Sequence, residues 1–129
     1  MKTTRIVAPI AAISTAVLLA TATPAIAKGR EVRTSGQCQG VAVWKMKAKT
    51  EDRGLEVEAE VDSNRRGQTW HWTLRHNGRA VASGNRKTAG RSGSFEIERV
   101  TGNRAGTDVF RFNARRPGTR QVCRGTVRF

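Results

Sequence analysis

Apolar and polar residues alternate with a period of two along most of the chain from Val41 onward, and no stretch shows a clear helical period. Such alternation predicts β-strands that have one buried face and one solvent-exposed face. Runs of this kind recur every 8–14 residues and are separated by polar or glycine-containing segments. The pattern predicts seven short strands and an all-β fold, an antiparallel sandwich.

The first two of these runs carry opposite charges at their polar positions. Residues 44–49 alternate apolar side chains with lysines, and residues 55–62 alternate apolar side chains with carboxylates. If the runs pair as a hairpin, the two sets of charges face each other on the solvent side. The expected partners are Lys45, Lys47 and Lys49 on one strand and Glu56, Glu58 and Glu60 on the other. Trp44 and Val57 then point inward, because a one-residue slip would turn every apolar residue outward.

The aromatic residues and one turn complete the prediction of the core. Asn77-Gly78 follows the run that contains Trp70 and Trp72, and this dipeptide predicts a tight hairpin turn because both of its residues tolerate positive φ. The three Trp and four Phe residues all fall on predicted strands at inward positions. We therefore expect no aromatic side chain in the loops.

The first 27 residues have the features of a cleavable secretory signal peptide. A short cationic head precedes an apolar run, and Ala25-Ile26-Ala27 has the small-x-small pattern of a cleavage site. The apolar run is shorter than the ~20 residues that span a bilayer, so no membrane span is expected after cleavage. The sequence thus divides into a signal peptide at 1–27, a flexible basic segment at 28–37 and a folded domain at 38–129. The expected location is extracellular, either secreted or associated with the cell envelope.

The chain contains two cysteines, Cys38 near the start of the predicted domain and Cys123 near its end. Thiols in exported proteins generally pair, and there is no Cys-x-x-Cys spacing that would indicate a redox site. We expect a structural disulfide between Cys38 and Cys123 that links the first and last strands. A bridge across 85 residues restricts the unfolded chain considerably.

The order of elements resembles immunoglobulin-like and fibronectin type III-like domains. Trp70 or Trp72 lies on the third predicted strand, where such domains bury a tryptophan, and Asp108-Val109-Phe110 opens the sixth, where they often have Asp-x-Tyr. The stretch from Asp62 to Trp70 and the terminal Cys-x-Gly-x-Val motif are similar to those of small uncharacterised secreted proteins of actinomycetes. These resemblances imply an immunoglobulin-like sandwich and an extracellular location, and they imply no particular activity.

Positive charge dominates the composition, with 24 Lys and Arg against 10 Asp and Glu and a formal net charge of +14. If consecutive strands alternate in direction, the loops at 62–68, 84–94 and 114–120 emerge at one pole. The basic N-terminal segment is expected to enter at that pole as well. The loops hold one carboxylate, Asp62, and eight cations that form the candidate anion-binding site: Arg65, Arg66, Arg86, Lys87, Arg91, Arg115, Arg116 and Arg120.

Candidate catalytic and metal-binding residues are scarce. His71 and His76 are the only histidines, and both are interpreted as surface residues without a zinc-ligand spacing. Seven of the ten carboxylates lie on the second predicted strand or in the turn and strand beside it: Glu51, Asp52, Glu56, Glu58, Glu60, Glu96 and Glu98. We expect them to face lysines, which lower a carboxyl pKa rather than raise it as an acid catalyst needs. A serine nucleophile would need a histidine poised beside it, and neither histidine lies in such a context. We therefore expect neither an enzyme nor a metal or cofactor site.

The most direct functional interpretation is a basic, non-enzymatic binding or cell-envelope-associated module. Arginine forks suit phosphate and carboxylate, so the expected partner is an anionic polymer. Teichoic acid, another anionic envelope glycan or extracellular DNA held through its phosphates would fit, since no aromatic residue is placed to stack on bases. Three alternatives remain: basic loops that serve solubility alone, a secreted carrier of a small hydrophobic ligand, and an enzyme.

Overall fold

The computed structural model describes residues 29–129 and contains eight β-strands, with no helix among these residues. The proposed signal peptide at 1–27 and Lys28 lie outside the described residues. In chain order the strands are β1 (Glu31–Gln37), β2 (Val43–Glu51), β3 (Gly54–Asp62), β4 (Thr69–His76), β5 (Arg79–Lys87), β6 (Ser94–Thr101), β7 (Val109–Arg115) and β8 (Val122–Arg128).

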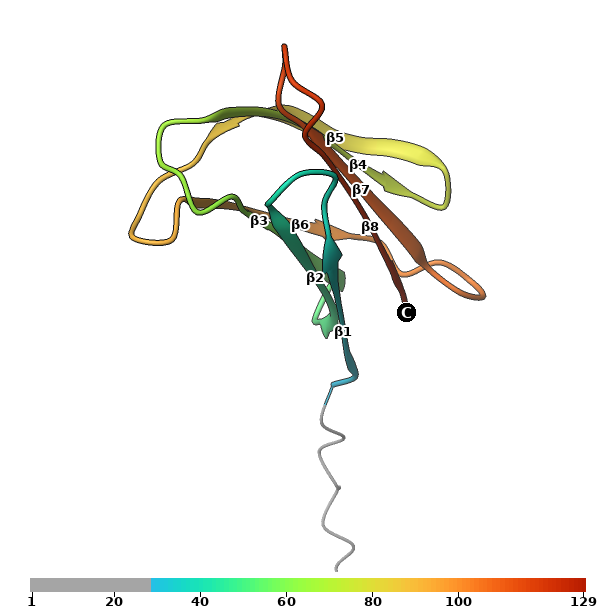
Figure 1. Ribbon diagram of the computed structural model, residues 1–129. Coiled ribbons are helices and arrows are strands. Elements are labelled where there is room, and N and C mark those ends of the chain that lie inside the picture. The colour runs from blue at the N-terminus through green and yellow to red at the C-terminus, as the bar shows by residue number, and fades with distance from the viewer. Residues whose placement is uncertain (1–28) are drawn as a thin grey trace, which may run out of the picture.

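The strands form two four-stranded sheets that pack face to face (Figure 1). One sheet has the order β1-β2-β3-β6 and the other has the order β5-β4-β7-β8. Every pair of neighbouring strands is antiparallel. The prediction of an all-β antiparallel sandwich is therefore confirmed.

The sandwich has eight strands and not seven, because the segment before Cys38 forms β1. Residues 28–37 were expected to be a flexible extension, but Glu31–Gln37 pairs along its whole length with β2. The inward positions of this strand are Val32, Thr34 and Gly36, so it lacks the apolar alternation that identified the other strands. A hydrogen bond from the Thr34 hydroxyl to the Thr126 carbonyl, 2.9 Å long, ties it to the other sheet.

The charged hairpin forms in the predicted register. Lys45 lies opposite Glu60, Lys47 opposite Glu58, and Lys49 opposite Glu56. The Lys47 ammonium is 2.6 Å from the Glu58 carboxylate, and that of Lys49 is 3.2 Å from the Glu56 carboxylate. As predicted, Val57 is buried, and Trp44 packs against the core.

The core fills the space between the sheets with the predicted inward residues. Trp70, Leu74 and Phe110 are fully buried, and all seven aromatic residues are either buried or packed against the core. The Trp44 indole occupies room left by two glycines. A Cβ at Gly36 would lie 2.8 Å from this ring, and one at Gly125 of the opposite sheet would lie 2.7 Å from it. These positions need glycine because real Cβ atoms essentially never approach another heavy atom that closely.

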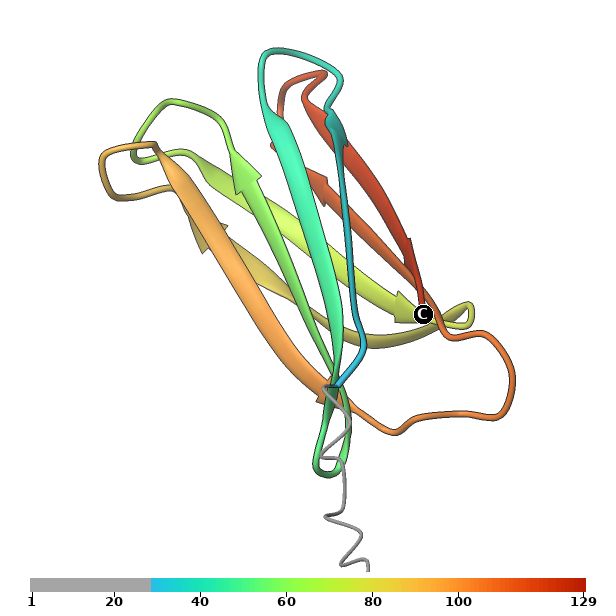
Figure 2. The ribbon, with the colours of Figure 1, turned by 90° about the horizontal axis from the view of Figure 1, so that it is seen from below.

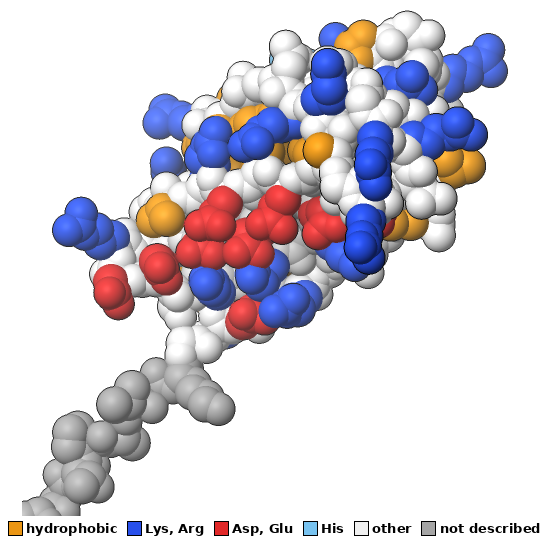
Figure 3. Space-filling model, turned by 90° about the vertical axis from the view of Figure 1, so that its left-hand side faces the viewer, with side chains coloured by type: hydrophobic (Ala, Val, Ile, Leu, Met, Phe, Trp, Pro, Cys, Tyr) orange, Lys and Arg blue, Asp and Glu red, His pale blue; other side chains and the backbone are white. Residues whose placement is uncertain are grey.

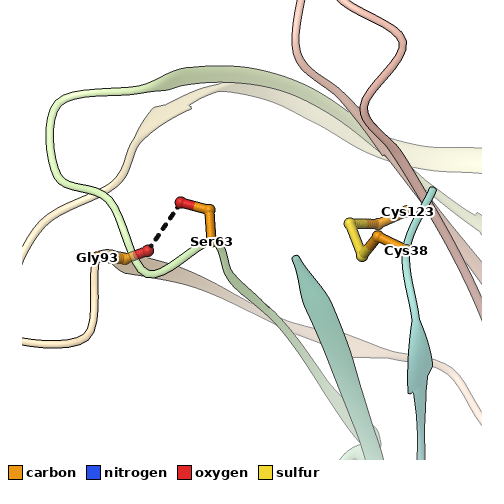
Figure 4. The surroundings of a disulfide bond; sticks show 4 residues. All are labelled: Cys38, Ser63, Gly93 and Cys123. Carbon is orange, nitrogen blue, oxygen red and sulfur yellow. Dashed lines mark hydrogen bonds between the residues drawn. A yellow bond between two sulfur atoms is a disulfide. The ribbon is translucent and has the colours of Figure 1, made fainter. Parts of the chain in front are cut away.

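The disulfide between Cys38 and Cys123 is present, as predicted, and links the end of β1 to β8 (Figure 4). The two Cα atoms are 4.3 Å apart, and both cysteines are buried. Backbone hydrogen bonds between Gln39 and Val122 continue the connection beside the bridge. The first and last strands are thereby joined at one end of the sandwich.

The predicted Asn77-Gly78 turn joins β4 to β5, with φ of 48° and 84° at its two residues. After this turn β5 runs to Lys87, whereas the sequence pattern placed residues 84–94 in a loop. The reason is that β5 is an edge strand with mostly exposed residues, so it has little apolar alternation. Arg86 and Lys87 consequently lie on a strand and not in a loop.

Candidate anion-binding surface

Four connections leave the sandwich at one end, because neighbouring strands alternate in direction (Figure 2). They are residues 38–42, 63–68, 88–93 and 116–121. We call this the cationic end, because these connections and the adjoining strand ends hold all eight predicted cations. The set is Arg65, Arg66, Arg86, Lys87, Arg91, Arg115, Arg116 and Arg120.

The cations are divided between two pairs of connections that lie apart in Figures 1 and 2. Arg65, Arg66 and Arg91 belong to the pair 63–68 and 88–93, and Arg86 and Lys87 lead into it. The second pair, 38–42 and 116–121, forms the other group, with Arg115, Arg116 and Arg120. The structure thus brings the predicted residues to one end but does not gather them in a single cluster.

The first pair of connections is held together by hydrogen bonds between them. The Ser63 hydroxyl lies 3.1 Å from the Gly93 carbonyl oxygen (Figure 4), and the Gly67 amide donates to the Thr88 carbonyl at 2.7 Å. The two connections pack so closely that a Cβ at Gly93 would lie 2.4 Å from the Arg65 backbone nitrogen. The Arg65 carbonyl also accepts a hydrogen bond from Thr88. The backbone that carries Arg65 is therefore fixed, while its side chain remains exposed.

The second pair is fixed by the disulfide and by its own turn. The Arg116 amide donates to the Gln121 carbonyl at 3.0 Å, and the Thr119 hydroxyl donates to the Arg116 carbonyl at 2.7 Å. Arg120 is exposed and Arg116 is half-buried. Among residues 29–129, no ion pair involves any of the eight cations of the cationic end.

The basic N-terminal segment does not join this end, contrary to the prediction. The Arg30 carbonyl accepts a hydrogen bond from the Thr50 amide, and its guanidinium lies 4.9 Å from the centre of the Phe129 ring. Both contacts are at the opposite end of the sandwich. The unpredicted strand β1 is the cause, because one additional strand reverses the end at which the chain enters.

The charges also divide between the two sheets, which the loop-based prediction did not reveal. The strands β1, β2, β3 and β6 contain eight of the ten carboxylates. The strands β4, β5, β7 and β8 contain no carboxylate and eight Lys and Arg residues. Figure 3 shows the carboxylates as a band across one face, with basic side chains both above and below it. The signal was present in the sequence as a lack of acids in these four runs, but the assignment of runs to sheets was needed to see it.

In the sheet β1-β2-β3-β6, which we call the acidic sheet, like charges lie directly opposite each other. Glu58 pairs with Glu98, and Glu60 pairs with Glu96, in the register of β3 and β6. Burial and the neighbouring carboxylates raise the pKa of Glu96, and burial raises the pKa of Glu56. The hydrogen bond from Lys47 lowers the pKa of Glu58, in line with the expectation. The expectation of lowered pKa values is thus wrong for two of the carboxylates, since it ignored desolvation and β6.

One group of carboxylates has a spacing that a cation could bridge. The carboxylate oxygens of Glu56, Glu58 and Glu98 lie within 4.8 Å of one another. Lys49 and Lys47 already neutralise the first two. These contacts account for Glu56 and Glu58 as part of the charged hairpin, and Glu98 lies opposite Glu58 on β6.

His76 is not a surface residue, contrary to the sequence interpretation. It is buried, and its Nε2 lies 2.6 Å from the Asp108 carboxylate. Its partner is 32 residues away in the sequence, so the local pattern at the Asn77-Gly78 turn did not indicate the contact. His71 does face outward from β4, half-buried, with its Nδ1 3.0 Å from the Asn85 side-chain oxygen.

A hollow of about 410 Å³ lies on the outer side of the acidic sheet. Six of its nine lining residues are charged, and none is aromatic: Arg33, Thr34, Ser35, Lys45, Met46, Lys47, Glu58, Glu60 and Glu96. Such a lining does not suit a small hydrophobic ligand. It therefore gives no support to the interpretation as a hydrophobic carrier.

Comparisons of the chain with protein-family models, with curated proteins and with solved structures found no match. The resemblance to immunoglobulin-like and actinomycete secreted proteins therefore stays a prediction. Across residues 29–129 there is also no helix with the length and apolar character needed to cross a membrane.

Proposed function

We propose that this protein is an exported, immunoglobulin-like, non-enzymatic module that binds anionic polymers at its cationic end. One observation carries the proposal: the arginines of this end are held on fixed backbone, and none is neutralised by a carboxylate among the described residues. Eight uncompensated cations at one end of a small domain create a local positive potential. A surface of this kind attracts polyanions and releases their counterions on binding.

The chemistry of the cationic end suits ion pairing rather than shape recognition. Seven of its eight cations are arginines, whose planar forks donate two parallel hydrogen bonds to phosphate or carboxylate. The aromatic residues are occupied in the core or packed against it, so they supply no stacking platform for bases or sugar rings. The binding we propose is consequently tolerant of polymer sequence and sensitive to salt.

The location rests on two features. The signal-like residues 1–27 favour export, and the Cys38–Cys123 disulfide is consistent with an extracellular environment. A protein outside a cell would meet phosphate-rich or carboxylate-rich envelope polymers and released nucleic acid. The anionic partner we propose belongs to that environment.

The test compares variants that remove equal charge from different places. The end variant changes Arg65, Arg66, Arg91 and Arg116 to Gln. The control variant changes four cations at the opposite end to Gln: Arg30, Arg53, Arg79 and Arg104. We expect the end variant to lower affinity for a glycerol-phosphate polymer at least tenfold at low salt, while the control variant changes it less than threefold.

Two results would contradict the proposal. Equal losses in the two variants would show that net charge alone governs binding and that the cationic end is not a site. If the wild-type protein bound neither glycerol-phosphate polymer nor DNA at low salt, the arginines would serve solubility only.

A further inference from the structure

Four arginines form a regular ladder on the outer face of β7 and β8. The side chains of Arg111 and Arg115 on β7 and of Arg124 and Arg128 on β8 are all exposed. The inward positions, which alternate with the outward ones on both strands, are buried. None of the four belongs to an ion pair among residues 29–129. Three of them, Arg111, Arg124 and Arg128, lie outside the set identified from the loops.

The register of the two strands places one arginine in each successive row of this face. Arg115 lies opposite Val122, Arg124 opposite Asn113, Arg111 opposite Thr126, and Arg128 opposite Val109. The arginines therefore alternate between β7 and β8, and no arginine lies directly across from another on these two strands. Between β7 and β8 this arrangement avoids directly opposed like charges, which destabilise a sheet, yet it keeps a continuous line of positive charge.

The ladder begins at the cationic end and runs down the sheet. Arg115 is the last residue of β7 and is followed directly by Arg116 of the cationic end. Outward residues two apart on a strand are separated by about 7 Å, so three steps extend the line by about 20 Å. On the neighbouring strand β4, Arg75 lies opposite Arg111 and widens the basic surface at that row. No carboxylate lies on any strand of this sheet.

We infer that the outer face of β7 and β8 is the track along which a single-chain polyol phosphodiester lies after it enters at the cationic end. This inference rests on the proposed function and names its surface and ligand class. One arginine in each row of β7 and β8 matches one linear chain of phosphates. The outward positions of β4, β7 and β8 hold no Trp or Phe, so the face contacts the charged backbone and does not stack on bases.

The experiment uses the mature protein and three variants that each remove four positive charges. The ladder variant changes Arg111, Arg115, Arg124 and Arg128 to Gln, and it is compared with the end variant and the control variant defined above. The probes are a glycerol-phosphate polymer, its monomer, single-stranded DNA and duplex DNA, each titrated over a range of salt concentrations. Two double variants, Arg111/Arg128→Gln and Arg115/Arg124→Gln, keep the test valid if substitution of all four arginines prevents folding.

We expect the ladder variant to lose at least tenfold affinity for the polymer, while the control variant stays within threefold of wild type. The slope of log affinity against log salt should fall in magnitude by about 3 for the ladder variant and by about 1.4 for each double variant, because each lost contact removes about 0.7. The monomer should bind all forms equally weakly, since it reaches one arginine at a time.

The outcomes separate this inference from the proposed function. If the end variant lost binding and the ladder variant resembled the control, the track would be wrong and the cationic end would stand. If the ladder variant alone lost binding, the track would stand and the loop arginines would not be the site. Tighter binding of either form of DNA than of the polymer, at equal phosphate concentration, would overturn the assignment to a polyol phosphodiester. Absence of binding to every probe would overturn both proposals.

Discussion

The imidazole Nε2 of His76 lies 2.6 Å from Oδ1 of Asp108, and each residue is only 1% exposed. The same carboxylate oxygen accepts a hydrogen bond from the Arg104 amide at 3.2 Å. The His76 ring stacks on Phe110 with 4.3 Å between ring centroids. This contact fixes the end of β4 to the start of β7, at the end of the sandwich opposite the cationic end.

Substitution of Asp108 should therefore be costly for folding. In an Asp108→Ala variant the His76 imidazole would stay buried without its partner, and we expect the free energy of unfolding to fall by about 3 kcal/mol. Asp52→Ala, at an exposed turn, is the control and should change stability by less than about 0.5 kcal/mol. Urea denaturation measures both. Equal stabilities of the two variants would show that the buried pair contributes nothing.

Removal of the disulfide tests the connection between the first and last strands. The bridge spans 85 residues, and its loss from a Cys38→Ser/Cys123→Ser variant should lower the free energy of unfolding by about 3–4 kcal/mol, mainly because the unfolded chain gains freedom. Denaturation of the oxidised wild-type protein and of the variant gives the difference. A midpoint shared by the two proteins would contradict this account.

Lys47 and Lys45 offer a matched pair of substitutions on one strand. Lys47 contacts Glu58 at 2.6 Å, whereas Lys45 is more exposed and forms no ion pair among the described residues. Lys47→Met should lower stability by about 1 kcal/mol more than Lys45→Met at neutral pH. The pKa of Glu58 is below its ordinary value of 4.5, so the contribution is present above pH 4.5 and is lost as the pH falls through the lowered value. A difference that persisted in strong acid would argue against the ion pair as its source.

The Glu96→Gln substitution should change stability in the opposite direction and raise the free energy of unfolding. Burial and the carboxylates of Glu58 and Glu60 raise the pKa of Glu96 above 4.5, so the folded state holds its proton more tightly than the unfolded state. Stability then falls as the pH rises from 4.5 through the raised value. At about pH 7 the variant should be more stable than wild type by about 0.5 kcal/mol, and below about pH 4 the gain should disappear. Glu51→Gln, at an exposed position outside this group of carboxylates, is the control for the loss of one negative charge.

The sequence by itself determined the strands that have one strongly apolar face. Lysines alternate with apolar residues on β2, and glutamates alternate with apolar residues on β3. These two patterns were sufficient to fix the register of the strands, since a slip by one residue would expose the core. Asn77-Gly78 determined its turn because few other residue pairs accept two positive φ values. An even number of cysteines behind a signal-like segment likewise indicated the bridge.

Tertiary structure decided the features that depend on partners distant in sequence. β1 exists because Thr34 and Gly36 fit against β2 and β8, and its own residues are too weakly apolar to predict it. His76 is buried because Asp108 reaches it from 32 residues away. The arginines of β7 and β8 had outward positions in the sequence pattern, but only the register between the two strands places them in alternate rows. Local patterns specify which face a side chain occupies, whereas the packing of strands specifies which charges become neighbours.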